Sequence, residues 1–191
     1  MKQDLKKIFD HYHKKIHSDA DLKPSAVLLP LFYKEDHIHI LLTQRSEQVL
    51  YHKGQICFPG GSYQPGDTTL LQTALRETEE EIGLTAGDVE VLGELDDNST
   101  TSSRYVISPF VALIPYPYTF KPNYSEIKQI ISVPLSGLTS ELHYIQSSPN
   151  SNKQYRINYT YHYGEHVIWG VTARILNQLI ELLELRNGTP G

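Results

Sequence analysis

Three glutamates at helical spacing are the residues in this chain best suited to chemistry. On a helix, Glu77, Glu80 and Glu81 occupy positions i, i+3 and i+4 and project from one face. Like charges at this spacing repel one another, and anions are disfavoured near a helix C-terminus. A divalent cation such as Mg²⁺ or Mn²⁺ prefers oxygen ligands and would remove this conflict. The alternative interpretation is an acidic helix face that contacts only solvent.

A pair of glycines precedes the acidic segment. Gly60 and Gly61 have no Cβ, so their backbone can approach a ligand closely. They lie within residues 44–67, which contain too many turn-forming residues for one regular element. A loop of this length inside a compact domain is usually functional. Oxygen atoms from the loop backbone and from the helix would form a site that holds a metal ion and a pyrophosphate.

Residues 76–84 and the glycine pair match a known signature. They read Arg-Glu-x-x-Glu-Glu-x-Gly-Leu, and they resemble the Nudix hydrolase signature Gly-x5-Glu-x7-Arg-Glu-U-x-Glu-Glu-x-Gly-U, in which U is aliphatic. The first half departs from the signature, because the loop counted from Gly61 is one residue longer. Asp67 or Thr68 stands in place of the first glutamate, and Thr78 replaces an aliphatic residue.

The longer loop is similar to that of one Nudix subgroup, the coenzyme A pyrophosphatases. Their loop often reads Phe-Pro-Gly-Gly, then Asp, then Thr-Ala-Leu-Arg-Glu, and this chain has these residues at 58–61, 67 and 73–77. An upstream subgroup motif begins at residues 41–43, with Arg45 in place of a threonine and Leu50 in place of an arginine. The resemblance covers roughly residues 25–185 and includes segments at 101–109, 133–135 and 168–176.

The resemblance implies that the chain hydrolyses a pyrophosphate linkage in a nucleoside diphosphate derivative, with Mg²⁺ or Mn²⁺. It also implies that the Gly60 carbonyl helps to bind the metal. We expect Glu80 and Glu81 to be direct ligands, and Glu77 to be a third ligand or to orient a water molecule. Arg76 is expected to organise the carboxylates rather than to catalyse.

Further candidates lie outside the signature helix. Glu126 precedes a predicted strand, where related enzymes often place another carboxylate that binds metal or activates water; the alternative is an exposed loop glutamate. Arg45, His52, Lys53 and Gly61 are the predicted substrate contacts, and for the three cations an ordinary surface role is equally possible.

Three further residues have competing interpretations. Asp67 is either a metal-site residue or the N-cap of the acidic helix. Cys57 is expected to be a small buried residue rather than a nucleophile. Leu50 bears on the substrate, because a missing arginine could mean a missing phosphate contact.

The expected substrate is coenzyme A or a derivative, cleaved to 4′-phosphopantetheine and adenosine 3′,5′-bisphosphate. The alternatives are another dinucleotide, such as NADH or ADP-ribose, and a nucleotide-binding regulatory domain without turnover. The intact set of three glutamates argues against the regulatory domain, because a site without catalytic activity would gain nothing from three carboxylates that repel one another.

Periodicity predicts the elements that must position these residues. We expect helices at 3–17, 68–82 and 169–185, and strands at 26–33, 37–43, 89–95, 105–114, 127–133, 142–146 and 155–163. Gly83 is expected to cap the middle helix at its C-terminus. The pattern indicates an α/β or α+β fold, and the resemblance implies an α/β/α sandwich around a mixed sheet. We expect an N-terminal helical segment at 1–22, the Nudix domain at 23–186 and a tail at 187–191.

Composition narrows the classes of partner. The chain has 191 residues, one cysteine and a formal net charge of −5. Broad attraction to nucleic acid or to an anionic membrane is not expected, and one cysteine excludes an internal disulfide framework. The sequence shows no membrane-spanning segment and no signal peptide. We therefore expect a cytoplasmic monomer or homodimer whose partner is a small nucleotide.

Overall fold

The computed structural model describes residues 2–17, 19, 21–49, 52–100, 103–146 and 155–187. Its α-helices are α1 (Lys2–Asp10), α2 (Leu70–Ile82) and α3 (Gly170–Asn187), and its 3₁₀ helices are η1 (Ala86–Asp88) and η2 (Leu135–Gly137). Its strands are β1 (Lys23–Lys34), β2 (His37–Arg45), β3 (Ile56–Cys57), β4 (Gly60–Ser62), β5 (Glu90–Glu94), β6 (Asn98–Ser99), β7 (Tyr105–Leu113), β8 (Ile127–Pro134), β9 (Thr139–Gln146), β10 (Tyr155–Tyr163) and β11 (His166–Ile168).

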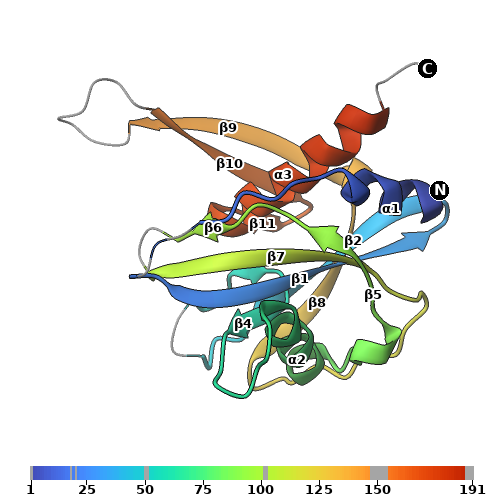
Figure 1. Ribbon diagram of the computed structural model, residues 1–191, viewed down its shortest axis with the longest axis vertical. Coiled ribbons are helices and arrows are strands. Elements are labelled where there is room, and N and C mark those ends of the chain that lie inside the picture. The colour runs from blue at the N-terminus through green and yellow to red at the C-terminus, as the bar shows by residue number, and fades with distance from the viewer. Residues whose placement is uncertain are drawn as a thin grey trace.

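Strand β1 is the centre of a mixed sheet. It pairs with β7 in parallel, and with β2 and β4 antiparallel. The sheet runs in the order β3-β2-β1-β7-β5, with β8 added to β2 and β6 added to β7. Helix α2 lies on one side of this sheet, and α1 and α3 lie on the other (Figure 1). The expected α/β/α sandwich around a mixed sheet is therefore confirmed.

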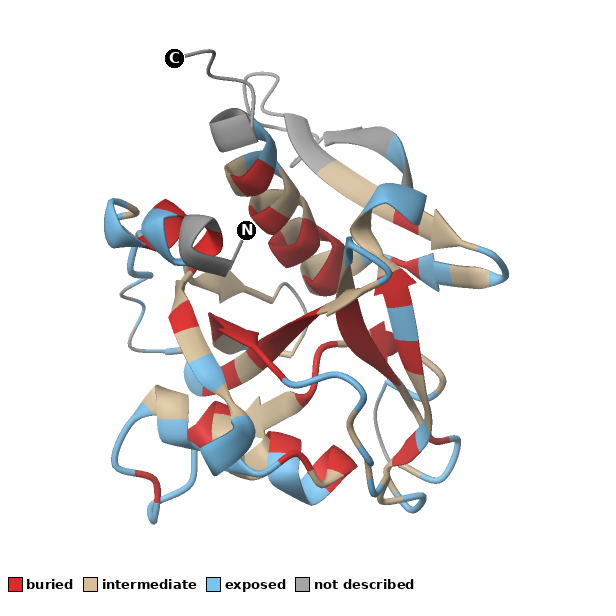
Figure 2. Cartoon of the chain, turned by 90° about the vertical axis from the view of Figure 1, so that its right-hand side faces the viewer, coloured by how far each residue is buried: buried red, intermediate tan, exposed pale blue. Residues whose placement is uncertain are grey.

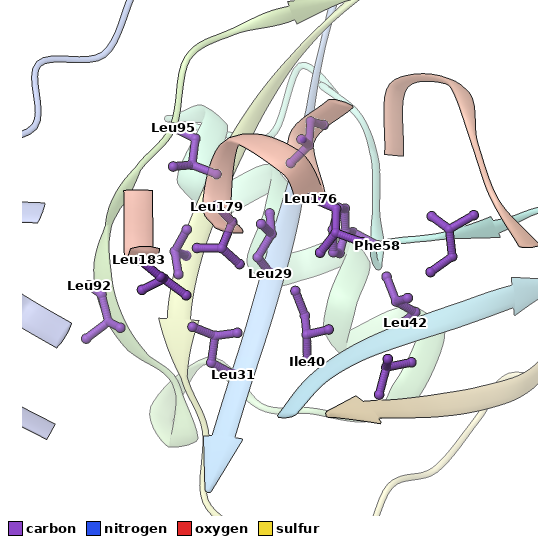
Figure 3. Packing of buried hydrophobic residues seen from close by; sticks show 14 of the residues in the cluster. Leu29, Leu31, Ile40, Leu42, Phe58, Leu92, Leu95, Leu176, Leu179 and Leu183 are labelled. Carbon is purple, nitrogen blue, oxygen red and sulfur yellow. The ribbon is translucent and has the colours of Figure 1, made fainter. Parts of the chain in front are cut away.

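Alternation along the strands supplies a separate core to each face of the sheet. In β1, Leu29 and Leu31 belong to the cluster shared with α1 and α3, whereas Leu28 and Phe32 belong to the cluster shared with α2. Figure 3 shows side chains of β1, β2 and β5 gathered in the same cluster as leucines of α3. Buried residues gather in the central strands between the helical layers (Figure 2).

A second, three-stranded sheet was not anticipated as a separate layer. It has the order β11-β10-β9, and β10 packs against α3. The two long strands were predicted, but β11, β3, β4 and β6 were not. These four have only two or three residues each, too few to show an alternating pattern. Residues 147–154, which connect these two strands, lie outside the described residues.

The N-terminal helix is shorter than predicted. It ends at Asp10 instead of continuing to residue 17, and Ile16, which lies within the predicted helix, is 74% exposed. The chain beyond the helix is held instead by the end of β5 and by the loop that follows it. Lys14 Nζ lies 2.6 Å from Glu94 Oε2, and the Lys15 amide donates to Asp96 Oδ1 at 2.8 Å. These long-range bonds outweigh the local helical pattern.

The two ends of α2 test the predicted caps. The N-cap is Thr69, whose hydroxyl accepts a hydrogen bond from the Gln72 amide at 3.1 Å. The prediction that Asp67 is the N-cap is therefore wrong. At the other end, Gly83 adopts the left-handed conformation with φ of 70°, as predicted, and its amide donates to the Glu79 carbonyl.

None of the helices in the described ranges is both long enough and apolar enough to cross a membrane.

The contact between α1 and β5 can be tested with two glycines. A Cβ added to Gly93 of β5 would lie 2.6 Å from the Phe9 Cβ, whereas a Cβ added to Gly87 would meet nothing within 4 Å. We expect Gly93→Ala to lower the free energy of unfolding by about 1–3 kcal/mol, because α1 must move outward. Urea unfolding measures the change, with Gly87→Ala as the matched control. Equal stability of the two variants would contradict the packing of α1 on β5.

Candidate active site

The glycine loop is built onto the central strand. Val27 and Ala26 of β1 pair antiparallel with Gly60 and Gly61, and the Leu28 amide donates to the Pro59 carbonyl at 2.9 Å. Gly60 has a φ of +149°, and a Cβ there would collide with the β1 backbone. Only glycine lets the loop lie this close to β1. The sequence predicted that the Gly60 backbone approaches a ligand closely, and the structure shows that it approaches the backbone of β1 closely.

Helix α2 brings its carboxylates to this loop. Its buried side includes Ala74, Thr78 and Ile82, which pack against the sheet. Thr78 departs from the aliphatic residue of the signature, but its hydroxyl donates to the Ala74 carbonyl at 2.6 Å and is therefore satisfied in the core. Glu77 and Glu81 flank this buried stripe, so the helix aims both toward the loop.

Glu81 is buried to an extent unusual for a carboxylate, with only 2% of its surface exposed. Its Oε2 accepts a hydrogen bond from the Gly60 amide at 3.2 Å, and its Oε1 lies 3.9 Å from Arg45 Nη1. Burial raises the pKa of the Glu81 carboxyl to about 8, against the smaller opposing effects of Gly60 and Arg45. The interpretation of the acidic helix as a merely solvated face is wrong at this position.

Glu77 lies next to Gly61. A Cβ on Gly61 would come within 2.7 Å of Glu77 Oε1, so this glycine makes room for the carboxylate. Burial raises the Glu77 pKa, the guanidinium of Arg76 opposes the rise, and the charges of Glu80 and Glu126 add to it.

Arg76 is bound on both sides. Its Nε and Nη2 donate to the two oxygens of Asp67 at 2.9 and 3.0 Å, and its Nη1 donates to Glu77 at 2.9 Å and to Glu80 at 3.2 Å. Asp67 is buried and also accepts from the Thr73 hydroxyl, and Arg76 holds the pKa of its carboxyl far below the usual range. Asp67 thus holds the arginine in place.

Glu80 is the most open of the three predicted ligands. Its side chain is 56% exposed, and its contact is the hydrogen bond from Arg76. Glu79, which faces a different side of the helix, is also exposed. The predicted common face is therefore split, because Glu77 and Glu81 turn inward while Glu80 stays at the rim.

Glu126 reaches the site through a loop fastened to the end of α2. The Lys121 amide donates to the Ile82 carbonyl at 2.8 Å, and the Asn123 amide donates to the Glu81 carbonyl at 2.9 Å. The Asn123 side chain then donates to Glu126 Oε1 at 3.1 Å. The charge of Glu126 raises the pKa of both Glu77 and Glu81, so the three carboxylates share one region. The sequence did not predict a role for Asn123, because no local motif surrounds it.

The three predicted cations are not equivalent. Arg45, at the end of β2, approaches Glu81, whereas His52 and Lys53 lie exposed on the turn between β2 and β3. His52 bonds with the Gln55 side chain at 2.9 Å. Within the described residues, neither His52 nor Lys53 forms an ion pair with a carboxylate of α2. Leu50, which bears on the substrate, lies outside the described residues, as does Thr101 in the segment at 101–109.

Cys57 lies beside these groups without becoming reactive. Burial raises the pKa of its thiol to about 11, and the charge of Glu81 adds to the rise. Its sulfur lies 3.5 Å from the Thr43 hydroxyl. A thiol with this pKa stays protonated at neutral pH, in line with the expectation that it is not a nucleophile.

The site suits a hard dication by the chemistry of its donors. All the candidate ligands are oxygen atoms, and among the described residues one amide and a distant arginine offset the charge of the buried Glu81. As the side chains stand, no group of three or more His, Cys, Asp or Glu among the described residues is gathered tightly enough to hold a metal ion. Glu77 and Glu80 point instead toward Arg76, whose charge substitutes for that of a cation.

The raised pKa of Glu81 predicts a specific dependence of stability on pH in the metal-free protein. The carboxyl titrates near 4.5 when unfolded and near 8 when folded, so the folded state holds an extra proton between these values. This contribution is complete below pH 4.5 and is lost as the pH rises to about 8, on the order of a few kcal/mol. Glu81→Gln removes it. Urea unfolding of both proteins across this interval measures the difference, and parallel pH profiles would contradict the burial of Glu81.

Comparison with known proteins identifies the family. Residues 22–150 match the NUDIX domain. An uncharacterized Nudix hydrolase NudL from Photorhabdus laumondii is 39% identical over 163 residues, which cover 84% of this chain and 85% of that protein. The protein of the same name from Yersinia enterocolitica is 35% identical, over 87% of this chain and 84% of that protein.

Solved structures agree on the fold. A MutT/nudix family protein from Enterococcus faecalis has a TM-score of 0.59 at 13% identity, covering 96% of this chain and 75% of that chain. An Ap4A hydrolase from C. elegans, solved as a binary complex, has a TM-score of 0.51 at 21% identity, covering 60% of this chain and 82% of that chain. The fold, the glycine loop, the acidic helix and the sequence match lead to one conclusion: the chain belongs to the NUDIX domain family of Nudix hydrolases.

Proposed function

We propose that this protein hydrolyses the diphosphate linkage of coenzyme A or a coenzyme A derivative, with Mg²⁺ or Mn²⁺, to 4′-phosphopantetheine and adenosine 3′,5′-bisphosphate. The observation that carries the proposal is the burial of Glu81 against the Gly60 amide, with Glu77 and Glu126 nearby. Closely placed carboxyl groups beside a glycine loop suit a dication, and a dication there would attract a polyanionic diphosphate. The proposed location is the cytoplasm.

The chemistry requires charge neutralisation and an activated water. A diphosphate repels an incoming nucleophile until its negative charge is offset. A dication held by these carboxylates would supply that offset and would make water more acidic. We assign Glu80, Glu81 and the Gly60 carbonyl to binding the metal, with Glu77 as a third ligand or the residue that orients water.

Two further residues complete the proposed mechanism. Glu126, on the loop bound to the end of α2, is the candidate to take a proton from water or to add a ligand. Arg76 positions Glu77 and Glu80 through its hydrogen bonds, and it is itself held by Asp67.

The choice of coenzyme A rests on the resemblance of residues 41–61 and 73–77 to the coenzyme A pyrophosphatase motifs. One observation favours a second candidate, because Leu50 stands where that motif has an arginine. Loss of a phosphate contact would shift the preference toward a dinucleotide without a 3′-phosphate, such as NADH or ADP-ribose.

A substrate panel tests the proposed function. Purified protein with Mg²⁺ or Mn²⁺ is given coenzyme A, an acyl coenzyme A, NADH, ADP-ribose and a diadenosine polyphosphate, and the products are separated. We expect coenzyme A or its acyl derivative to be cleaved with the highest kcat/KM. Preferred cleavage of ADP-ribose or NADH would contradict the coenzyme A assignment, and turnover of no compound would favour a nucleotide-binding domain without catalysis.

A pair of neighbouring glutamates separates catalysis from folding. We expect Glu80→Gln to reduce kcat/KM by roughly 100-fold or more, because a metal ligand is lost. Since the Glu80 side chain is 56% exposed, thermal stability should change little. The control is Glu79→Gln, which removes the same charge from an exposed residue of the same helix. Similar rates for the two variants at saturating metal would refute the role of Glu80.

A further inference from the structure

Arg45 occupies an irregular position at the end of β2. The pairing of β2 with β8 changes register between Gln44 and Arg45, and such irregularities re-aim a side chain. The Arg45 backbone is fixed on its other side, because its amide donates to the Gln55 carbonyl at 2.9 Å and its carbonyl accepts from the Gly54 amide at 3.2 Å. The strand therefore holds the base of this side chain firmly and directs it toward α2.

The guanidinium of Arg45 is not fully used by its surroundings. Its Nη1 lies 3.9 Å from Glu81 Oε1, which is too long for a good hydrogen bond. Its Nε is buried and has no hydrogen-bond partner among the described residues. Glu77 and Glu80 are bonded to Arg76, so Glu81 is the carboxyl of α2 that Arg45 approaches.

A dication on Glu81 would lie close to the positive charge of Arg45, because Arg45 Nη1 is 3.9 Å from Glu81 Oε1. A metal ion on Glu81 would bring a double positive charge close to the guanidinium, which would raise the free energy of both. An anionic diphosphate lying against the metal would reverse this effect, because the planar guanidinium forms paired hydrogen bonds with phosphate oxygens. Arg45 thus weakens the binding of a metal ion alone and strengthens the binding of a metal ion together with substrate.

We propose that Arg45 couples the binding of metal and substrate by exchanging its partner: Glu81 in the metal-free protein, and a diphosphate oxygen of the substrate once a dication is on Glu81. The proposal rests on the proposed function and adds a specific role for this side chain. Coupling of this kind is reciprocal, so substrate strengthens metal binding by the same factor as metal strengthens substrate binding.

The test measures two affinities of Arg45→Gln that should move in opposite directions. Mn²⁺ binding without substrate, followed by calorimetry or by the electron paramagnetic resonance of free Mn²⁺, should become tighter by about 5-fold or more. The KM for the preferred diphosphate should rise by at least a similar factor, with a smaller change in kcat. A merely structural role would weaken both, and thermal melting checks the fold.

Two further variants sharpen the interpretation. Arg45→Lys keeps the charge but loses the planar pair of donors, so its Mn²⁺ affinity should match that of wild type while its KM rises. Lys34→Gln is the charge-matched control, because Lys34 lies at the opposite end of β1 from the Gly60 contact. It should leave both affinities unchanged.

The outcomes distinguish this proposal from the proposed function. If wild-type protein is active but Arg45→Gln binds Mn²⁺ no more tightly, or has an unchanged KM, the partner exchange is overturned and the proposed function stands. If wild-type protein cleaves no diphosphate, the proposed function fails, and the substrate half of this proposal fails with it.

Discussion

The burial of one carboxylate, that of Glu81, is the constraint on which the rest of the site depends. Removing an anion from water is costly unless charge or hydrogen bonds compensate it. Here the compensation is one amide at 3.2 Å and an arginine at 3.9 Å, which leaves the group with a strongly raised pKa. A chain selected for stability alone would bury an apolar residue instead. The simplest account is that a dication supplies the missing charge when the protein works.

The architecture serves this constraint by joining the glycine loop and α2 to one strand. Strand β1 holds the glycine loop through backbone pairing and supports α2 through its buried face. The end of α2 in turn holds the loop that delivers Glu126, because the Asn123 and Lys121 amides bind its last carbonyls. Arg76 keeps the anions together while Asp67 anchors it. Glu77 and Glu80 are thus positioned by Arg76, Glu81 by the Gly60 amide and Glu126 by the Asn123 side chain.

Local patterns predicted those parts whose causes are local. The acidic helix, its Gly83 cap, the long strands and the mixed sheet follow from periodicity and from the signature. The end of α1, the role of Asp67 and the position of Asn123 do not, since each depends on partners distant in the sequence or on competition between neighbouring caps. Thr69 is the N-cap of α2, whereas the Asp67 carboxylate accepts hydrogen bonds from Arg76. Periodicity could not predict that Glu80 is exposed while Glu77 and Glu81 turn inward. Residue spacing predicts which side chains share a face of a helix, but it does not predict what packs against that face.

The central claim is tested most directly by counting the protons released when Mn²⁺ binds. Calorimetric titrations near neutral pH, in two buffers of different ionisation enthalpy, give this number for the wild type and for Glu81→Gln. Metal must displace the proton that burial keeps on Glu81, so the account predicts release of about one proton by the wild type and much less by the variant. Binding of Mn²⁺ by the wild type without proton release, or equal release by both proteins, would contradict it.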